Sequence, residues 1–284
     1  ITCRDWSSDV CSSDLWNVTN GVLESSMPHR AGAGSFALSA DGSVLAVSPA
    51  PQTIELRSLP KLGLLAQWSD AGDACSALAF APQGLQLAIG HVSGKVAIRG
   101  VPEGQPVAET RMAGPVRLLC WSWDGQALLA AEQPEVIIWR PTTGDRLAID
   151  CGEDPIRCAE YSADNSRLLT VNSSRIRIWD ATRGQLVREL GASAAINHAA
   201  FSPDGLTVGS ANNAGRGRLQ HLTDENLAQS LLHDAPVHTI RFAPSGSMLL
   251  TASADCSARL WSFPPGRSIA QPVFHNLPVL DARF

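Results

Sequence analysis

Histidine, cysteine and carboxylate side chains are the residues of this chain that could perform catalysis or bind a metal. The 284 residues include 7 histidines and 7 cysteines. No two cysteines have Cys-x-x-Cys spacing, and no cysteine–histidine cluster has the spacing of a zinc site. The chain also lacks a phosphate-binding loop, a His-Glu-x-x-His motif and a Gly-x-Ser-x-Gly motif. We therefore expect no enzyme activity, no catalytic residue, no cofactor and no metal.

Four aspartates share one local context, which suggests a structural role. Each follows a serine by two residues and precedes glycine or asparagine: Asp41, Asp124, Asp164 and Asp204. Aspartate in this position accepts hydrogen bonds from its own backbone and stabilises a turn. We interpret the four carboxylates as turn residues rather than as a catalytic or metal-binding cluster.

These turns belong to a repeat of about forty residues that runs through the chain. An aromatic or apolar anchor residue stands just before each turn, and successive anchors are 40 to 42 residues apart. The anchors are Leu38, Phe80, Trp121, Tyr161, Phe201, Phe242 and Phe284. A second anchor, tryptophan, ends an alternating apolar run at Trp139, Trp179 and Trp261.

Each repeat contains four short strand patterns separated by glycine, proline, asparagine or aspartate. In the last complete repeat we expect strands over 237–242, 247–253, 258–262 and 268–274. The glycine that ends the first turn should adopt a positive φ angle, and Asn165, which replaces it once, tolerates that angle best after glycine. The chain is therefore predicted to be all-β.

With its Phe201-Ser-Pro-Asp-Gly turn, variants of that turn in the other repeats, and its Ile178-Trp179-Asp180 strand end, the chain resembles the WD-repeat β-propeller family over residues 15–284. The resemblance implies a β-propeller of four-stranded antiparallel blades over residues 16–284. We expect six complete blades, anchored near 38, 80, 121, 161, 201 and 242, and an incomplete seventh blade from the two chain ends. The truncated repeat at 279–284 and strands near 13–26 would form that blade, without its second strand.

The family resemblance also implies a structural network in the repeat that ends at Trp261. In this family a histidine, a serine or threonine, an aspartate and the tryptophan bond one another and hold a blade together. The matching residues here are His233, Thr251 or Ser253, Asp255 and Trp261. The other repeats lack one or more members of this set.

The chain start does not fit the repeat. Residues 1–15 contain the echo Ser-Ser-Asp-Val, Ser-Ser-Asp-Leu and resemble translated sequencing-adapter sequence. We expect this segment to be an artefact or a disordered leader, and the remainder to be a fragment of a longer protein.

In the family, partners bind the face that carries two register positions: one four residues before the anchor, and one just before the second turn. Here the polar residues at these positions are Arg117, Arg157, Asn197, His238, Glu132 and Asn172. We expect them to bind an acidic or phosphorylated protein segment, with the arginines as planar donors. The alternative is that these side chains are solvated or paired with Glu132 and Asp154.

Composition limits the partners further. The net charge of −5 and the pI near 5.8 argue against nucleic-acid binding, and no apolar run is long enough for a membrane span. We expect a cytoplasmic, non-catalytic scaffold that binds protein or peptide, cut from a longer bacterial protein. One alternative is a sensor or regulatory domain attached to a kinase or NTPase. A less favoured alternative is a propeller enzyme of the lactonase or glycosidase type.

Overall fold

The computed structural model confirms the all-β prediction: every regular element among the described residues is a strand, and the strands pair antiparallel into four-stranded sheets. The structure describes residues 2–4, 10–16, 23–30, 35–69, 73–132, 135–152, 154–224, 228–264, 268–269, 271–274, 278–279 and 282–283. The chain divides into two compact units, which are described separately below. Unit 1 comprises Ile1–Pro28, Arg157–Asp180 and Leu186–Phe284, and unit 2 comprises His29–Ile156 and Ala181–Gln185.

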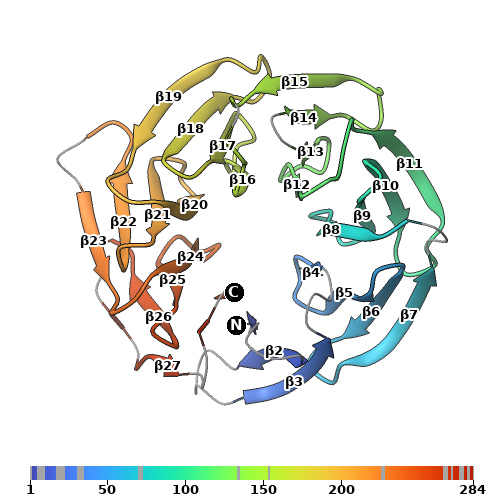
Figure 1. Cartoon of the computed structure of the whole chain (residues 1–284), viewed down its shortest axis with the longest axis horizontal. Helices are drawn as coiled ribbons and strands as arrows, with labels where there is room; N and C mark the ends of the chain where they lie inside the picture. The colour runs from blue at the N-terminus through green and yellow to red at the C-terminus, as the bar shows by residue number, and fades with distance from the viewer. Residues whose placement is uncertain are drawn as a thin grey trace. The chain divides into compact units, whose positions relative to one another are not determined.

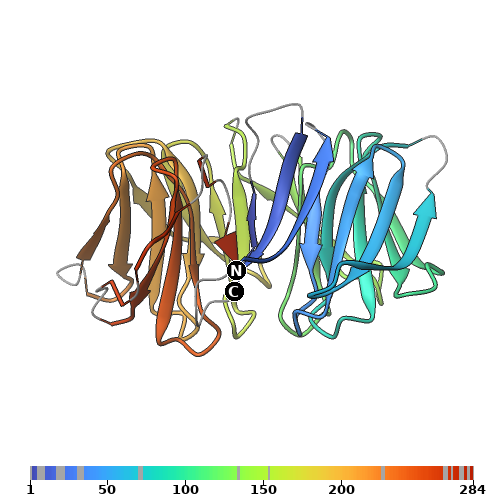
Figure 2. The ribbon, with the colours of Figure 1, turned by 90° about the horizontal axis from the view of Figure 1, so that it is seen from below.

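Unit 2 contains three consecutive sheets, one for each repeat (Figure 1). Their strands are β4 (Phe36–Leu38), β5 (Val44–Ala50), β6 (Thr53–Ser58), β7 (Gly63–Ser69); β8 (Cys75–Phe80), β9 (Gln86–His91), β10 (Lys95–Gly100), β11 (Pro106–Arg111); β12 (Leu118–Trp121), β13 (Leu128–Ala131), β14 (Glu135–Trp139) and β15 (Arg146–Asp150). The first strands β4, β8 and β12 lie next to one another, whereas the fourth strands end their sheets. Figure 2 shows neighbouring strands of these sheets running in opposite directions.

Unit 1 repeats the same topology three times. Its strands are β16 (Cys158–Tyr161), β17 (Arg167–Val171), β18 (Arg175–Asp180), β19 (Leu186–Gly191); β20 (Ile196–Phe201), β21 (Thr207–Asn212), β22 (Arg216–His221), β23 (Ala228–Leu232); β24 (Val237–Phe242), β25 (Met248–Ser253), β26 (Ser257–Ser262) and β27 (Val273–Phe274). The first three strands expected for the last repeat are confirmed to within one residue. The fourth is shorter than expected.

A further sheet joins the two chain ends, in the order β28 (Ala282–Arg283), β1 (Thr2–Arg4), β2 (Val10–Trp16) and β3 (Leu23–Arg30). We expected this blade to lack its second strand. The structure differs, because Thr2–Arg4 pairs with both β2 and β28 and so occupies that position. The artefactual origin of residues 1–15 is a separate matter and stays a prediction.

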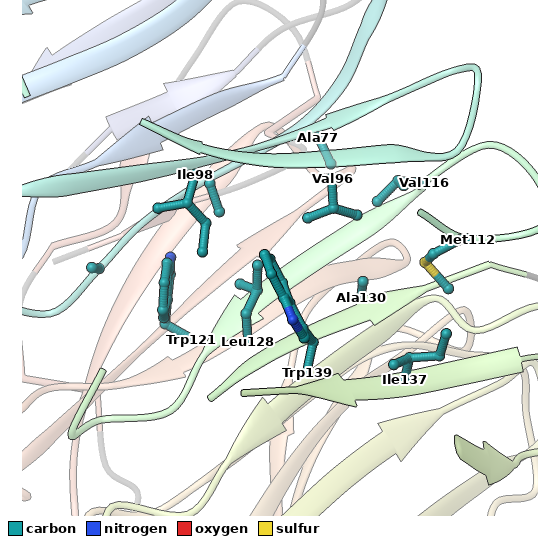
Figure 3. Packing of buried hydrophobic residues seen from close by; sticks show 12 residues of the cluster. Ala77, Val96, Ile98, Met112, Val116, Trp121, Leu128, Ala130, Ile137 and Trp139 are labelled. Carbon is teal, nitrogen blue, oxygen red and sulfur yellow. The ribbon is translucent and has the colours of Figure 1, made fainter. Parts of the chain in front are cut away.

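Alternating apolar residues build the core between neighbouring sheets. In unit 2, Trp121 and Trp139 are 7% and 4% exposed and pack against Val96 and Ile98 of the preceding sheet. Figure 3 shows both indole rings pointing toward these aliphatic side chains. A single blade could not bury such large rings alone, so each sheet depends on its neighbour.

The first turn of each repeat has the predicted geometry. The turn glycines Gly42, Gly84, Gly125, Gly205 and Gly246 have φ angles between 67° and 72°. Asn165 takes the same conformation at φ 58°. The left-handed conformation carries a steric cost for most side chains, so the asparagine at this position is explained by backbone geometry.

Candidate functional site

A hydrogen-bonded chain of side chains lies within the sheet of β24–β27. Nδ1 of His233 lies 2.8 Å from Oδ2 of Asp255, and Nε2 lies 2.7 Å from Oγ1 of Thr251. The indole N–H of Trp261 donates to the same Thr251 oxygen at 2.8 Å. The backbone N–H of Asp255 donates to Ser253, whose hydroxyl donates to the carbonyls of Ala235 and Pro236. The five residues therefore tie the connection before β24 to β25 and β26.

The protonation states of this network follow from its surroundings. Burial lowers the pKa of His233, although the neighbouring Asp255 acts in the opposite direction. Burial also acts to raise the pKa of Asp255, but hydrogen bonds from Ser257 and His233 outweigh it and hold this pKa at about 2. Asp255 also pairs with Arg259 at 3.0 Å. His233 and Thr251 are buried, so these hydrogen bonds lie inside the sheet.

In three repeats, the position four residues before the anchor has a geometry that the sequence did not reveal. In β8, β20 and β24 it is a β-bulge, so Ser76, Asn197 and His238 have no cross-strand partner in the ladder. A bulge bends the strand and redirects the side chain. Two of these side chains then connect repeats: Ser76 donates to the carbonyl of Val116, and Asn197 donates to that of Val237. Gly34 and Leu280, at the same register position, lie outside the described residues.

In unit 1 the structure brings together Arg157, Asn197 and the turn residue Asn213. Nη1 of Arg157 lies 3.4 Å from Oδ1 of Asn197, and Nδ2 of Asn197 lies 2.7 Å from Oδ1 of Asn213. Arg157 is exposed. His238 is half-buried, and burial lowers its pKa, so its ring is neutral near pH 7. The exposed cation of this group is therefore the Arg157 guanidinium.

The remaining predicted contact residues, Arg117 and Glu132, belong to unit 2. Arg117 is exposed, and the described residues give its side chain neither a hydrogen bond nor an ion pair. Glu132 is half-buried and accepts a hydrogen bond from the backbone N–H of Gly114. Its carboxylate thus holds the connection that leads into β12, and it does not neutralise Arg117.

The prediction that Asn172 contacts a partner is wrong. Asn172 is only 3% exposed, and its Oδ1 accepts the backbone N–H groups of Ser174 and Arg175 at 3.2 and 2.9 Å. These bonds stabilise the turn between β17 and β18. Because the carboxamide is used by the backbone of its own turn, the side chain points inward rather than toward a partner.

The charged pair of Glu160 and Arg241 was not predicted from the sequence. Oε1 of Glu160 accepts the backbone N–H of Phe201 at 3.0 Å, and Oε2 lies 3.7 Å from Nη1 of Arg241. Burial raises the pKa of Glu160 to about 7, against the opposing effects of Arg241 and the Phe201 N–H. The only signal in the sequence is a charged residue one position before the anchor, where four other repeats have alanine or cysteine.

Two further observations concern the described residues alone. They contain no group of three or more histidine, cysteine or carboxylate side chains placed to hold a metal ion. They also contain no helix with the length and apolar character that a membrane crossing requires.

Comparison with known proteins agrees with the fold. Residues 226–262, which include β23–β26 and the His233–Trp261 network, match the family model described as WD domain, G-beta repeat. The match thus falls on the repeat that carries the full set of network residues. Together with the four-stranded sheets and the relatives below, it supports assignment to the WD-repeat family.

The chain is similar to several curated proteins, of which three are described. It is 24% identical over 169 residues to a chicken (Gallus gallus) protein named serine-threonine kinase receptor-associated protein, covering 59% of this chain and 48% of that protein. The mouse (Mus musculus) protein of the same name is 22% identical over 168 residues, with the same coverage of 59% and 48%. The periodic tryptophan protein 2 homolog of Neurospora crassa is 38% identical over 52 residues, which are 18% of this chain and 6% of that protein. The chain thus spans about half the length of the first two relatives.

Proposed function

We propose that this chain is a cytoplasmic, non-catalytic scaffold that binds other proteins. The observation that carries the proposal is the exposed Arg157 guanidinium, which lies beside Asn197 at the same register position of two neighbouring repeats. WD-repeat assignment and the named relatives support the scaffold part of the proposal. Fold alone does not define function, so the binding surface must be argued from its side chains.

The surface we propose in unit 1 is the Arg157 group, which consists of Arg157, Asn197 and His238. Arg157 is an exposed guanidinium whose side chain, within the described residues, makes a long hydrogen bond to the neutral amide of Asn197. A planar guanidinium can bind a carboxylate or phosphate through two parallel hydrogen bonds. We therefore infer that the ligand is an acidic or phosphorylated protein segment. In unit 2, Arg117 is also an exposed guanidinium, and its contribution to ligand binding is tested separately.

The names of the relatives suggest which partner class to examine first. The chicken and mouse proteins are named for association with a serine-threonine kinase receptor. Our second candidate function is therefore regulation within a kinase-containing assembly, in which the kinase is either bound to this chain or part of the same polypeptide. It is compatible with the scaffold proposal, because the same surface would recognise a phosphorylated segment.

The proposal is tested with the full chain immobilised and exposed to a library of acidic and phosphoserine-containing peptides. We expect Arg157→Ala to weaken capture of these peptides by about tenfold, the effect of losing one charge-assisted bidentate pair. Arg117→Ala is measured in parallel. The melting temperature of both variants should remain close to that of the parent protein, because both side chains are exposed.

Arg146→Ala is the matched control, since Arg146 is an exposed arginine at the start of β15 and outside the proposed surface. It should leave peptide capture unchanged. Equal capture by the parent protein and both Arg157→Ala and Arg117→Ala would contradict the proposed surface.

A further inference from the structure

Two arginines on β22 differ from their counterparts in the neighbouring repeats. Arg218 stands two residues before the position that holds the tryptophan anchor in the neighbouring repeats, as do Arg177 of β18 and Arg259 of β26. Arg177 pairs with Glu189 at 2.9 Å, and Arg259 pairs with Asp255 at 3.0 Å. In the described residues the side chains of Arg216 and Arg218 have neither a hydrogen bond nor an ion pair, and both are exposed.

Both arginines lie on one face of β22. Gly217 between them is buried and lies directly opposite Leu231, so closely that a Cβ at this glycine would stand 3.1 Å from Cβ of Leu231. Leu219 on that side is also buried. Because side chains alternate along a strand, Arg216 and Arg218 occupy the opposite face, about 7 Å apart.

The outer neighbour, β23, explains why the charges are not neutralised. In the β18–β19 sheet the outer strand supplies Glu189 directly opposite Arg177. In the β22–β23 sheet the residue opposite Arg218 is Ser230, a small neutral side chain. A guanidinium that is not held by the outer strand can extend past Ser230 toward the edge of the sheet.

Within the described residues, no strand pairs with the outer edge of β23. β23 is the last strand of its sheet (Figure 1), and its sequence Ala-Gln-Ser-Leu-Leu contains neither charge nor proline. Ala228, Gln229, Ser230 and Leu232 are exposed. Natural edge strands usually carry charges or proline that prevent pairing with another chain. Among the described fourth strands longer than two residues, β7 is the one other that carries no charge, and its Trp68 donates a hydrogen bond to the carbonyl of Pro102 in the next repeat.

From these observations we infer that β23 is the docking edge for an extended, acidic segment of a partner protein. The segment adds a fifth strand beside β23 through backbone hydrogen bonds, the mode known as β-augmentation. Carboxylates two residues apart on this strand match the spacing of Arg216 and Arg218 and take the role that Glu189 has for Arg177. The inference rests on the proposed scaffold function but assigns a different surface from the Arg157 group.

The test uses the full chain and a fluorescein-labelled decapeptide of alternating glutamate and threonine, with an alternating glutamine–threonine peptide as the neutral probe. Fluorescence anisotropy measures both affinities. We expect the acidic peptide to bind, and Arg216→Gln/Arg218→Gln to weaken its binding by about tenfold or more. The neutral peptide should bind much more weakly than the acidic one.

A second variant tests the same surface while keeping both arginines. Ser230→Glu places a carboxylate opposite Arg218, as Glu189 lies opposite Arg177. This variant should also lose affinity for the acidic peptide, while its melting temperature is unchanged or raised. Arg111→Gln/Arg146→Gln is the charge-matched control, since both arginines are exposed on other fourth strands. It should change the affinity less than about twofold, because it alters only the general field of the protein.

Several outcomes would overturn the inference. The first is that the acidic peptide does not bind. The second is that the charge-matched control loses as much affinity as Arg216→Gln/Arg218→Gln. The third is that the peptide does not bind but the protein self-associates and Ser230→Glu abolishes this, which would assign the edge to a second copy of this chain. Binding that is lost in Arg157→Ala but kept in Arg216→Gln/Arg218→Gln would overturn the β23 edge and leave the proposed function standing. The reverse pattern would support the edge and remove the Arg157 group as the binding surface for this peptide.

Discussion

Thr251 is the residue at which two buried polar groups meet. Its hydroxyl lies within hydrogen-bond distance of His233 and of the Trp261 indole. Thr170 provides an internal comparison, because its hydroxyl accepts the indole N–H of Trp179 at the same distance of 2.8 Å. The equivalent of His233 in that repeat is Gly152, which has no side chain. The two threonines are therefore matched in burial and in the tryptophan contact but differ in the histidine contact.

We predict that Thr251→Val destabilises the protein more than Thr170→Val does. Leaving one buried donor without a partner costs about 1–3 kcal/mol, and Thr251→Val affects His233 in addition to the tryptophan. The free energy of unfolding should fall by about 1–2 kcal/mol more for Thr251→Val than for Thr170→Val. Urea denaturation of both variants measures this difference. Equal losses would show that the His233 contact contributes little to stability.

At the scale of elements, Glu160 connects three first strands of unit 1. It lies on β16, accepts a backbone N–H from Phe201 of β20 and pairs with Arg241 of β24. The Glu160 side chain is 21% exposed, so it is largely removed from water. Its pKa of about 7 lies above the value of 4.5 for an unperturbed glutamate. The folded state therefore binds the Glu160 proton more tightly than the unfolded state does.

Because the folded state binds this proton more tightly, protonation of Glu160 stabilises the folded state. The stabilisation grows as the pH falls from 7 to 4.5 and is lost as the pH rises through 7. Glu160→Gln should remove that dependence, which amounts to about 1–3 kcal/mol across this range. Urea denaturation gives the unfolding free energy of the parent protein and of the variant at pH 5 and at pH 8. Subtracting the variant's change between the two pH values from that of the parent cancels the contributions of other titrating groups. Glu109→Gln, at a carboxylate that is 72% exposed, is the control. If the stability curves of the parent protein and Glu160→Gln run parallel, the assigned pKa is wrong.

At the scale of the whole molecule, each compact unit is a stack of sheets that share apolar layers. The layer of unit 2 in Figure 3 joins Trp121, Leu128 and Trp139 of one sheet to Val96 and Ile98 of the preceding sheet. A separate layer joins that preceding sheet to the one before it, through Leu87 and Ile54 among others. Such an architecture is stabilised by contacts between nearest neighbours.

We therefore predict that Trp139→Ala weakens two neighbouring sheets at once. Removing a buried tryptophan costs about 3–5 kcal/mol of unfolding free energy. Hydrogen exchange followed by mass spectrometry should show faster exchange in β13 and β14, and also in β9 and β10 of the preceding sheet. β5 and β6, one sheet further away, should change less. Faster exchange confined to β12–β15 would contradict the coupling of sheets through the shared layer.

The sequence alone was sufficient to define the repeat, the strands and the turns. Their signals are local: an anchor, a serine–aspartate turn with glycine or Asn165 in the left-handed conformation, and an alternating apolar run. The residues of the His233–Trp261 network could also be named, because the resemblance to the WD-repeat family implies them at fixed positions of one repeat. These features depend on neighbours within about forty residues, and the repetition of the pattern makes each copy support the others.

Only the tertiary structure decided how polar side chains are used. The bulge at Asn197, the inward carboxamide of Asn172 and the Glu160–Arg241 pair all depend on hydrogen bonds whose partners no local pattern specifies. The same holds for Arg218, since a pattern shows an arginine but not the absence of an opposing carboxylate. A polar side chain can bond its own turn, a neighbouring repeat or a partner protein at similar energy, so its role is set by the geometry that folding creates around it.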